Sequence, residues 1–170
     1  GQISSQGGLN GLFDFNPDQA VVDTDFAKSA INNAGTDLHP NADVRALITR
    51  DDTIYAAGAF SDTVFENIMA FRNNKATSLP GGGLNGAVSA MYTQGDFLYV
   101  AGDFNNSNTG DVPGLSHVGA YQYSKNRWAP LGAGLDGPVN TVVPLQMNIT
   151  DQKPETVIGF SGTFTHILPA

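Results

Sequence analysis

The residues best placed to do chemistry lie in one polar stretch, DFNNSNTGD, at positions 103–111. Calcium loops alternate oxygen-bearing side chains in this way to surround a hard cation. In an EF-hand, the sixth position would be glycine and the twelfth glutamate, but here they are Asn108 and Gly114. We therefore favour a solvated loop, and we predict no metal and no cofactor. The alternating residues are Asp103, Asn105, Ser107, Thr109 and Asp111.

The other candidate catalytic residues form no recognised constellation. Carboxylates are scattered, whereas a glycosidase needs two of them about 5–10 Å apart in a cleft. The three histidines, His39, His117 and His166, have no metal-binding spacing. No Gly-x-Ser-x-Gly elbow occurs, and GGGLNG (residues 81–86) lacks the Lys-Ser/Thr of a phosphate-binding loop. We predict no catalytic residues and no enzyme activity.

Six aromatic side chains could stack on sugars. Most of them fit the alternating positions of strands, which favours packing in a core, and Tyr121 and Tyr123 share one face of a strand. Carbohydrate binding stays open as an alternative. The six are Tyr55, Tyr92, Tyr99, Tyr121, Tyr123 and Trp128.

The composition indicates one folded domain rich in turns. The chain has 170 residues, of which 41% are hydrophobic and 14% charged, with 20 Gly and 9 Pro. Its formal net charge is −8, and only 8 Lys and Arg are present, no two adjacent. This balance argues against a nucleic-acid partner. The absence of Cys excludes disulfides, and no apolar run approaches the roughly 20 residues that cross a bilayer.

The positioning elements recur along the chain. TIYAAGAF (residues 53–60) matches FLYVAGDF (97–104), which places Gly58 and Gly102 44 positions apart. The segments that follow also match, ending in GLNG and GLDG, with Leu84 and Leu135 51 positions apart. A third copy begins at residue 138 and includes VIGFSGTF (157–164), and a partial copy opens the chain.

Each repeat reads as four short strands separated by turn formers. Four strands with a period of 44–51 residues are typical of a β-propeller blade. We therefore predict an all-β, propeller-like fold of about three blades. The single fragment 1–170 divides into a partial blade 1–43, repeats 44–86 and 87–137, and a partial blade 138–170. Only residues 25–32 suggest a helical period, and we interpret them as an irregular blade edge or a short helical turn. Because propellers have roughly 4–8 blades, we expect part of a larger ring or self-association to complete one.

Seven residues mark the repeat. The glycines of the second strand should remove side chains where inner strands crowd together, and the phenylalanines two positions later should fill the gap between blades. The tryptophan of a fourth strand should pack between neighbouring sheets, and the glycines of GLNG and GLDG should allow positive φ. The seven are Gly58, Gly102, Gly162, Phe60, Phe104, Phe164 and Trp128.

The segments IYAAGAFSDTVFENIMAF and LYVAGDFNN, with HVGAYQYSKNRWAPLGAGLDGPVNTV, resemble the repeats of fungal cortical marker proteins for cell polarity, the bud-site-selection landmarks. The resemblance covers about residues 44–164, and some motifs also resemble bacterial kelch-like surface repeats. It implies a kelch-like, glycosylated, extracellular propeller region, attached to the membrane only through an anchor of a longer parent chain. It also implies a protein partner at the cell cortex and no catalytic motif.

Two sequons agree with a cell-surface location reached through the secretory pathway. They begin at Asn105 (Asn-Asn-Ser) and Asn148 (Asn-Ile-Thr), both in polar insertions, and acceptor asparagines must be exposed. We therefore predict possible N-glycosylation at both. The expected function is a non-enzymatic protein-interaction module, and the alternative is a secreted carbohydrate-binding or glycan-active propeller.

Overall fold

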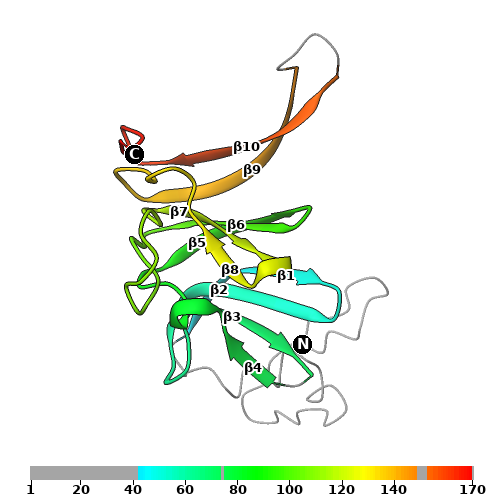
Figure 1. Ribbon diagram of the computed structural model, residues 1–170, viewed down its shortest axis with the longest axis vertical. Coiled ribbons are helices and arrows are strands. Elements are labelled where there is room, and N and C mark those ends of the chain that lie inside the picture. Colours follow the sequence, from blue (N-terminus) through cyan, green and yellow to red (C-terminus); the bar gives the residue numbers. More distant parts are fainter. Residues whose placement is uncertain (1–41, 74, 149–152, 170) are drawn as a thin grey trace, which may run out of the picture.

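The computed structural model describes residues 42–73, 75–148 and 153–169, which form three antiparallel sheets (Figure 1). The all-β prediction is confirmed, and no α-helix occurs in these ranges. The first sheet has the order β1 (Asp43–Arg50), β2 (Thr53–Ser61), β3 (Glu66–Arg72), β4 (Lys75–Ser78). The second has the order β5 (Val88–Gln94), β6 (Phe97–Gly102), β7 (Val118–Gln122), β8 (Arg127–Ala129). β9 (Val139–Met147) and β10 (Glu155–Gly162) form a hairpin, and two short 3-10 turns, Pro80–Gly82 and Tyr123–Lys125, complete the elements.

The sheets stack in chain order along the long axis of the molecule. In Figure 1, β1–β4 lies at the bottom, β5–β8 in the middle and the β9–β10 hairpin at the top, with the C-terminus beside the hairpin. Across the described part of the chain the sheets form an open stack and do not close into a ring. The opening partial copy and the helical turn expected at 25–32 lie outside the described residues.

Tight turns and alternating strands explain the meanders. The β1–β2 and β3–β4 turns contain Asp51 and Asn73 at φ 50° and 52°, and the β5–β6 turn contains Gly95 at φ 57°. Asp, Asn and Gly tolerate this left-handed conformation better than other residues do. The strands between them carry aromatic and β-branched side chains, which favour a pleated, half-buried surface.

A β-bulge recurs at one repeat position, and it explains the repeated glycines. The bulged residues of the first strands are Arg45, Ser89 and Asn140. A Cβ built on Gly102 would lie 2.1 Å from the carbonyl oxygen of Ala87, beside the bulge. The matching distances are 1.8 Å for Gly58 and 2.2 Å for Gly162. Glycine is therefore required by the backbone of the neighbouring strand, whereas we expected crowding of inner strands in general.

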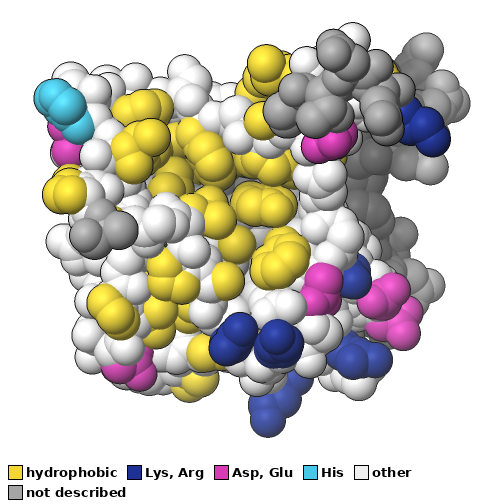
Figure 2. Space-filling model, turned by 45° about the horizontal axis from the view of Figure 1, so that its top comes forward, with side chains coloured by type: hydrophobic (Ala, Val, Ile, Leu, Met, Phe, Trp, Pro, Cys, Tyr) yellow, Lys and Arg dark blue, Asp and Glu magenta, His cyan; other side chains and the backbone are white. Residues whose placement is uncertain are grey.

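Two apolar clusters join the three sheets. The first cluster lies between β1–β4 and β5–β8 and is built around Ile68, Leu84 and Leu98, all fully buried. The second cluster lies between β5–β8 and the hairpin and is built around Val118 and Val139. Burial of this apolar surface, at about 25 cal/mol per Å², is the main force that holds the stack together. Some apolar side chains remain at the surface. Figure 2, in which the top of the stack is turned toward the viewer, shows hydrophobic side chains gathered on that face.

Candidate functional site

Two links between sheets, residues 79–87 (the first link) and 130–138 (the second link), carry polar groups that join one sheet to the next. Gly83 and Gly134 have φ of 94° and 88°, a conformation that excludes most side chains. In addition, a Cβ on Gly83 would lie 2.2 Å from the Glu66 carbonyl oxygen. The next residue, Leu84, donates its N–H to that same oxygen at 3.0 Å. The first link therefore lies directly against the start of β3.

Each link is also hydrogen-bonded to the next sheet. Leu84 forms an antiparallel bridge with Ser107, which lies in the β6–β7 loop. Leu135 of the second link bridges Ile167 in the same way. The carbonyl oxygen of Gly134 also accepts the N–H of Leu168 at 2.9 Å. Both links therefore run between two successive sheets and hold each to the other.

A polar side chain in each link closes the connection, and we call this arrangement the clasp. In the first link, Asn85 Oδ1 accepts the backbone N–H groups of Asn105 and Asn106 at 3.0 and 3.1 Å. The Nδ2 of Asn85 donates to Asn105 Oδ1 at 2.6 Å. One amide side chain thus satisfies two loop N–H groups of the following sheet.

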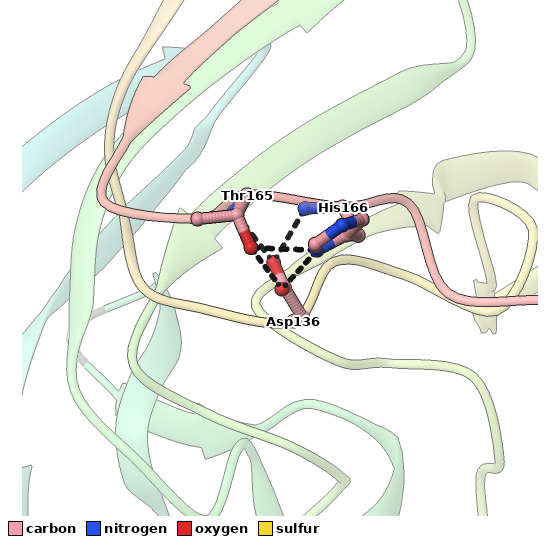
Figure 3. A network of polar contacts seen from close by, with 3 residues as sticks. All are labelled: Asp136, Thr165 and His166. Carbon is pink, nitrogen blue, oxygen red and sulfur yellow. Dashed lines mark hydrogen bonds and ion pairs between the residues drawn. The ribbon is translucent and has the colours of Figure 1, made fainter.

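The second clasp uses a carboxylate at the equivalent position (Figure 3). Asp136 Oδ1 accepts the backbone N–H groups of Thr165 and His166 at 2.7 and 2.8 Å. Its Oδ2 accepts the Thr165 hydroxyl at 2.6 Å and lies 3.1 Å from His166 Nδ1. These bonds, first the Thr165 hydroxyl and then the two backbone N–H groups, hold the pKa of the Asp136 carboxyl well below its usual range.

The Asp136–Thr165–His166 group has the residue types of a catalytic triad but not its geometry. In a triad, histidine contacts the carboxylate with Nδ1 and the nucleophile with Nε2. Here His166 Nδ1 lies within reach of both groups, 2.6 Å from Thr165 Oγ1 and 3.1 Å from Asp136 Oδ2. The Thr165 hydroxyl donates to the Asp136 carboxylate, whose lowered pKa makes it a weak base. Asn85 builds the same clasp without an acid, which indicates a structural role.

The polar loop between β6 and β7 does not gather the five alternating residues considered as calcium ligands around one point. Ser107 and Thr109 donate their hydroxyls to Asp111 Oδ1 at 2.6 and 2.7 Å, which lowers the pKa of the Asp111 carboxyl. Asp103 instead points toward His117, with 3.7 Å between Oδ1 and Nδ1. Within the described ranges, no three Asp, Glu or His side chains are close enough to hold a metal ion.

The aromatic residues considered for sugar stacking pack mainly on one another. The Tyr55 ring centroid lies 5.3 Å from that of Tyr123, and that of Trp128 lies 5.7 Å from Tyr121. Trp128 Nε1 donates to the Pro80 carbonyl oxygen at 2.8 Å, which ties β8 to the first link. Burial in this cluster raises the pKa of Tyr55 to about 12. Tyr92 and Tyr99 pack in the second cluster.

The remaining predicted residues lie at scattered positions. Phe104 is buried in the first cluster and Phe164 packs against the second, while Phe60 packs edge-on against Phe65 at 6.1 Å. Asn105 and Asn148 are exposed, but residues 149–152 beside Asn148 lie outside the description. His39 also lies outside the described residues. His117 contacts Asp103 and His166 contacts Asp136, so these two histidines share no site.

The clasp was not predicted from the sequence. We gave a role only to the glycines of GLNG and GLDG, and none to Asn85 and Asp136. The signal was present, because both positions carry a side chain with an acceptor oxygen between two glycine-bearing turns. Such side chains commonly bond to nearby backbone N–H groups in turns.

Comparison with known proteins gives two matches, both to proteins of polarized growth. No protein-family model matches the sequence. Polarized growth protein L1 of a Phoma species is 38% identical over 171 aligned positions, which cover 96% of this chain. Polarized growth protein rax2 of Schizosaccharomyces pombe is 32% identical over 125 positions, or 73% of the chain. The matched segments are 13% and 11% of these relatives.

In the part of the chain that the structure describes, no helix is long and apolar enough to span a membrane. Neither relative's name mentions kelch-like repeats, so the comparisons do not support that part of the expectation. The chain is thus similar to a segment of much longer fungal polarized growth proteins, and this similarity supports its resemblance to the polarity-marker family.

Proposed function

We propose that this chain is a non-enzymatic interaction module of a longer fungal polarity protein at the cell surface. In this proposal, its sheets are successive blades of a β-propeller whose remaining blades come from outside the described residues. The partner is a protein at the cell cortex, and any membrane attachment belongs to another part of the longer protein. The role rests on the two polarized growth relatives, and the blade arrangement rests on the repeat geometry.

The observation that carries the blade arrangement is the equivalence of the two clasps. Asn85 binds the N–H groups of residues 105 and 106, and Asp136 binds those of residues 165 and 166. The same link therefore joins sheet to sheet twice, with the same partners. A unit that attaches to its successor in one fixed way generates a regular array, and a propeller is such an array of four-stranded sheets arranged around an axis, so the repeated link supports the proposal.

The polar groups support a binding role over an enzymatic one. The Asp–Thr–His group is replaced by an Asn-based clasp in the neighbouring link, and the Asp111 carboxylate is occupied by two hydroxyls. Protein contacts fit this scaffold because rigid sheets can present long loops on a fixed surface. The exposed loop that includes Asn105 and Thr109 is such a loop.

The proposal is tested in the fungus that carries the full-length protein. An epitope inserted beside Gly110, which is exposed and has no atom within 4 Å of a built Cβ, should be stained on intact cells at growth sites. The matched variant with the tag and Gly102→Asp should unfold this segment and lose the growth-site pattern. Staining only after the cells are made permeable would overturn the surface location. Normal placement of growth sites in the Gly102→Asp strain would overturn the polarity role.

A further inference from the structure

The clasp residue of the first link is followed by glycine, and Asn-Gly is the dipeptide in which asparagine loses its amide most readily. Asn85 and Gly86 form this pair in the first link. Asp136 and Gly137 form the matching Asp-Gly pair in the second link. Glycine favours the reaction because it has no Cβ to shield its backbone nitrogen or to restrict its rotation. The side chain that holds the first link is therefore also a reactive one.

The reaction uses only atoms of the chain and water. The backbone nitrogen of Gly86 loses its proton and bonds to Asn85 Cγ, while the Cγ–Nδ2 bond breaks and Nδ2 leaves as ammonia. The product is a cyclic imide, the succinimide, which water opens in two ways. Cleavage of the new bond to Cγ gives aspartate. Cleavage of the original peptide bond gives isoaspartate, in which the main chain runs through Cγ.

Burial does not protect Asn85 from this reaction, because the residue is exposed and water reaches its amide. The reaction also needs geometry, since the attacking nitrogen has to approach Cγ closely and in line with the carbonyl group. Both the amide side chain and the backbone on its C-terminal side have to be free to turn. Protection therefore depends on how firmly these two groups are held.

The amide side chain is held by the clasp. Asn85 Oδ1 accepts the backbone N–H groups of Asn105 and Asn106 at 3.0 and 3.1 Å. The Nδ2 atom, which would leave as ammonia, donates to Asn105 Oδ1 at 2.6 Å. A turn of the amide would break these three hydrogen bonds together.

The backbone around Gly86 is held as well. A Cβ built on Gly86 would lie 2.0 Å from the Asp103 carbonyl oxygen, so this glycine packs directly against the backbone after β6. On one side, the Asn85 N–H donates to the Asn106 carbonyl oxygen at 3.1 Å. On the other side, the Ala87 carbonyl oxygen accepts the Asp103 N–H at 2.8 Å. The attacking nitrogen therefore lies between two hydrogen-bonded neighbours and has little room to move.

We propose that Asn85 is a deamidation site controlled by the clasp, which reacts with Gly86 only when the first link opens and whose isoaspartate product then prevents the link from closing. Isoaspartate adds a carbon to the main chain, which moves Gly86 from its place against Asp103. Aspartate leaves the main chain unchanged and occurs naturally in the second link, where Asp136 Oδ1 accepts the equivalent two N–H groups. An opening of the link is thereby recorded in the chain. This inference does not depend on a role in polarity.

The test is the rate of deamidation at Asn85 in the 170-residue chain, folded and unfolded in urea, at the same pH and temperature. Peptide mapping with mass spectrometry separates the asparagine, aspartate and isoaspartate forms of the peptide that contains residue 85. A synthetic peptide of residues 81–90 in the same two solutions corrects for the effect of urea itself. We expect the folded chain to react at least about a hundredfold more slowly, because the rate then follows the small population with an open link.

Two outcomes of this comparison would overturn the proposal. A corrected difference of less than about tenfold would show that the folded link does not control the reaction. An unfolded chain that keeps its asparagine at residue 85 would show that no reactive site exists. The comparison uses the wild-type chain, so it remains valid whether or not any variant folds.

Two variants test the contribution of the clasp. Asn105→Ala removes the acceptor of Asn85 Nδ2 and should speed deamidation of the folded chain about fivefold, the effect of one lost hydrogen bond. The matched control is Asn108→Ala, which changes another exposed asparagine of the same loop that the clasp does not use. It should react at the wild-type rate. Equal rates in Asn105→Ala and the wild type would contradict control by the clasp.

Refolding from urea tests the second half of the proposal. The Asn85→Asp variant should regain the circular dichroism and the urea midpoint of wild-type chains treated in the same way. Chains that carry isoaspartate at residue 85 should not. Isoaspartate chains with the wild-type midpoint would overturn the proposal. Failure of Asn85→Asp would overturn it too, because a charge at this position would then be enough to open the link.

Discussion

Replacement of Gly102 by Ala should destabilise the chain by forcing β5 away from β6. The added Cβ would lie 2.1 Å from the Ala87 carbonyl oxygen and 2.8 Å from the Val88 Cα, both backbone atoms that no rotamer change can move. The same oxygen accepts the Asp103 N–H at 2.8 Å, and this bond would be strained or lost. Overpacking costs about 1–3 kcal/mol and a hydrogen bond about 1 kcal/mol, which together predict a loss of about 3 kcal/mol.

The measurement is urea unfolding followed by circular dichroism. For a chain of this size, a loss of about 3 kcal/mol also lowers the thermal midpoint by about 6–12 °C. The control is Gly95→Ala, where no atom lies within 4 Å of the built Cβ and only the φ of 57° opposes the substitution. That strain costs about 1 kcal/mol. Equal losses of free energy in the two variants would refute the packing of the bulge carbonyl against Gly102.

Three further predictions concern polar groups. Asp136→Asn should keep the fold, because Asn85 forms the equivalent clasp. Since the folded pKa of Asp136 lies below its unfolded value of about 3.9, its contribution is present above that pH and lost as the pH falls. Unfolding midpoints measured from pH 6 to pH 2 should therefore fall less steeply in the variant, and identical profiles would contradict the clasp. Trp128→Phe should lose about 2 kcal/mol of unfolding free energy, measured in urea, because the Pro80 carbonyl loses its donor; an unchanged value would contradict the role of that bond. Millimolar calcium should leave the thermal midpoint unchanged, because the hydroxyls of Ser107 and Thr109 already bind Asp111; a rise with calcium and not with magnesium would show that the loop binds calcium.

Much of the fold could be predicted because each repeat is specified by residues that are close together in the sequence. Alternating apolar residues and turn formers such as Gly95 specify antiparallel meanders through short-range preferences. The match between the segments that contain Gly58 and Gly102 then showed which strands of the two repeats are equivalent. The all-β class followed from these patterns without any knowledge of long-range contacts.

The reason for the conserved pattern of glycines within the repeat could not be predicted in the same way. We expected Gly58, Gly102 and Gly162 to avoid crowding of inner strands. Their actual neighbour is a carbonyl oxygen beside a bulge on the paired strand, which depends on the register of two strands. Bulges leave only a weak mark in a sequence, because the extra residue can be of almost any type, here Arg45, Ser89 and Asn140.

The candidate site was the least predictable part. The alternating oxygens of residues 103–111 suggested a possible cation site, but Asp103 points to His117 while Asp111 binds Ser107 and Thr109. Side chains at every second position converge only if the backbone curls around one centre. This loop instead contacts the first link, where Asn85 binds it.

The sequence by itself determined the strands, their turns and their repetition, because these depend on neighbours within a few residues. Only the tertiary structure decided how the sheets are joined, because Asn85 and Asp136 find their partners 20 to 30 positions away in the chain. It also decided which apolar faces are covered. Leu47, Met91 and Val142 occupy one repeat position, yet within the described residues only the last two are packed against a preceding sheet. Burial depends on what lies across the interface, and a periodic pattern is the same whether that neighbour is present or not.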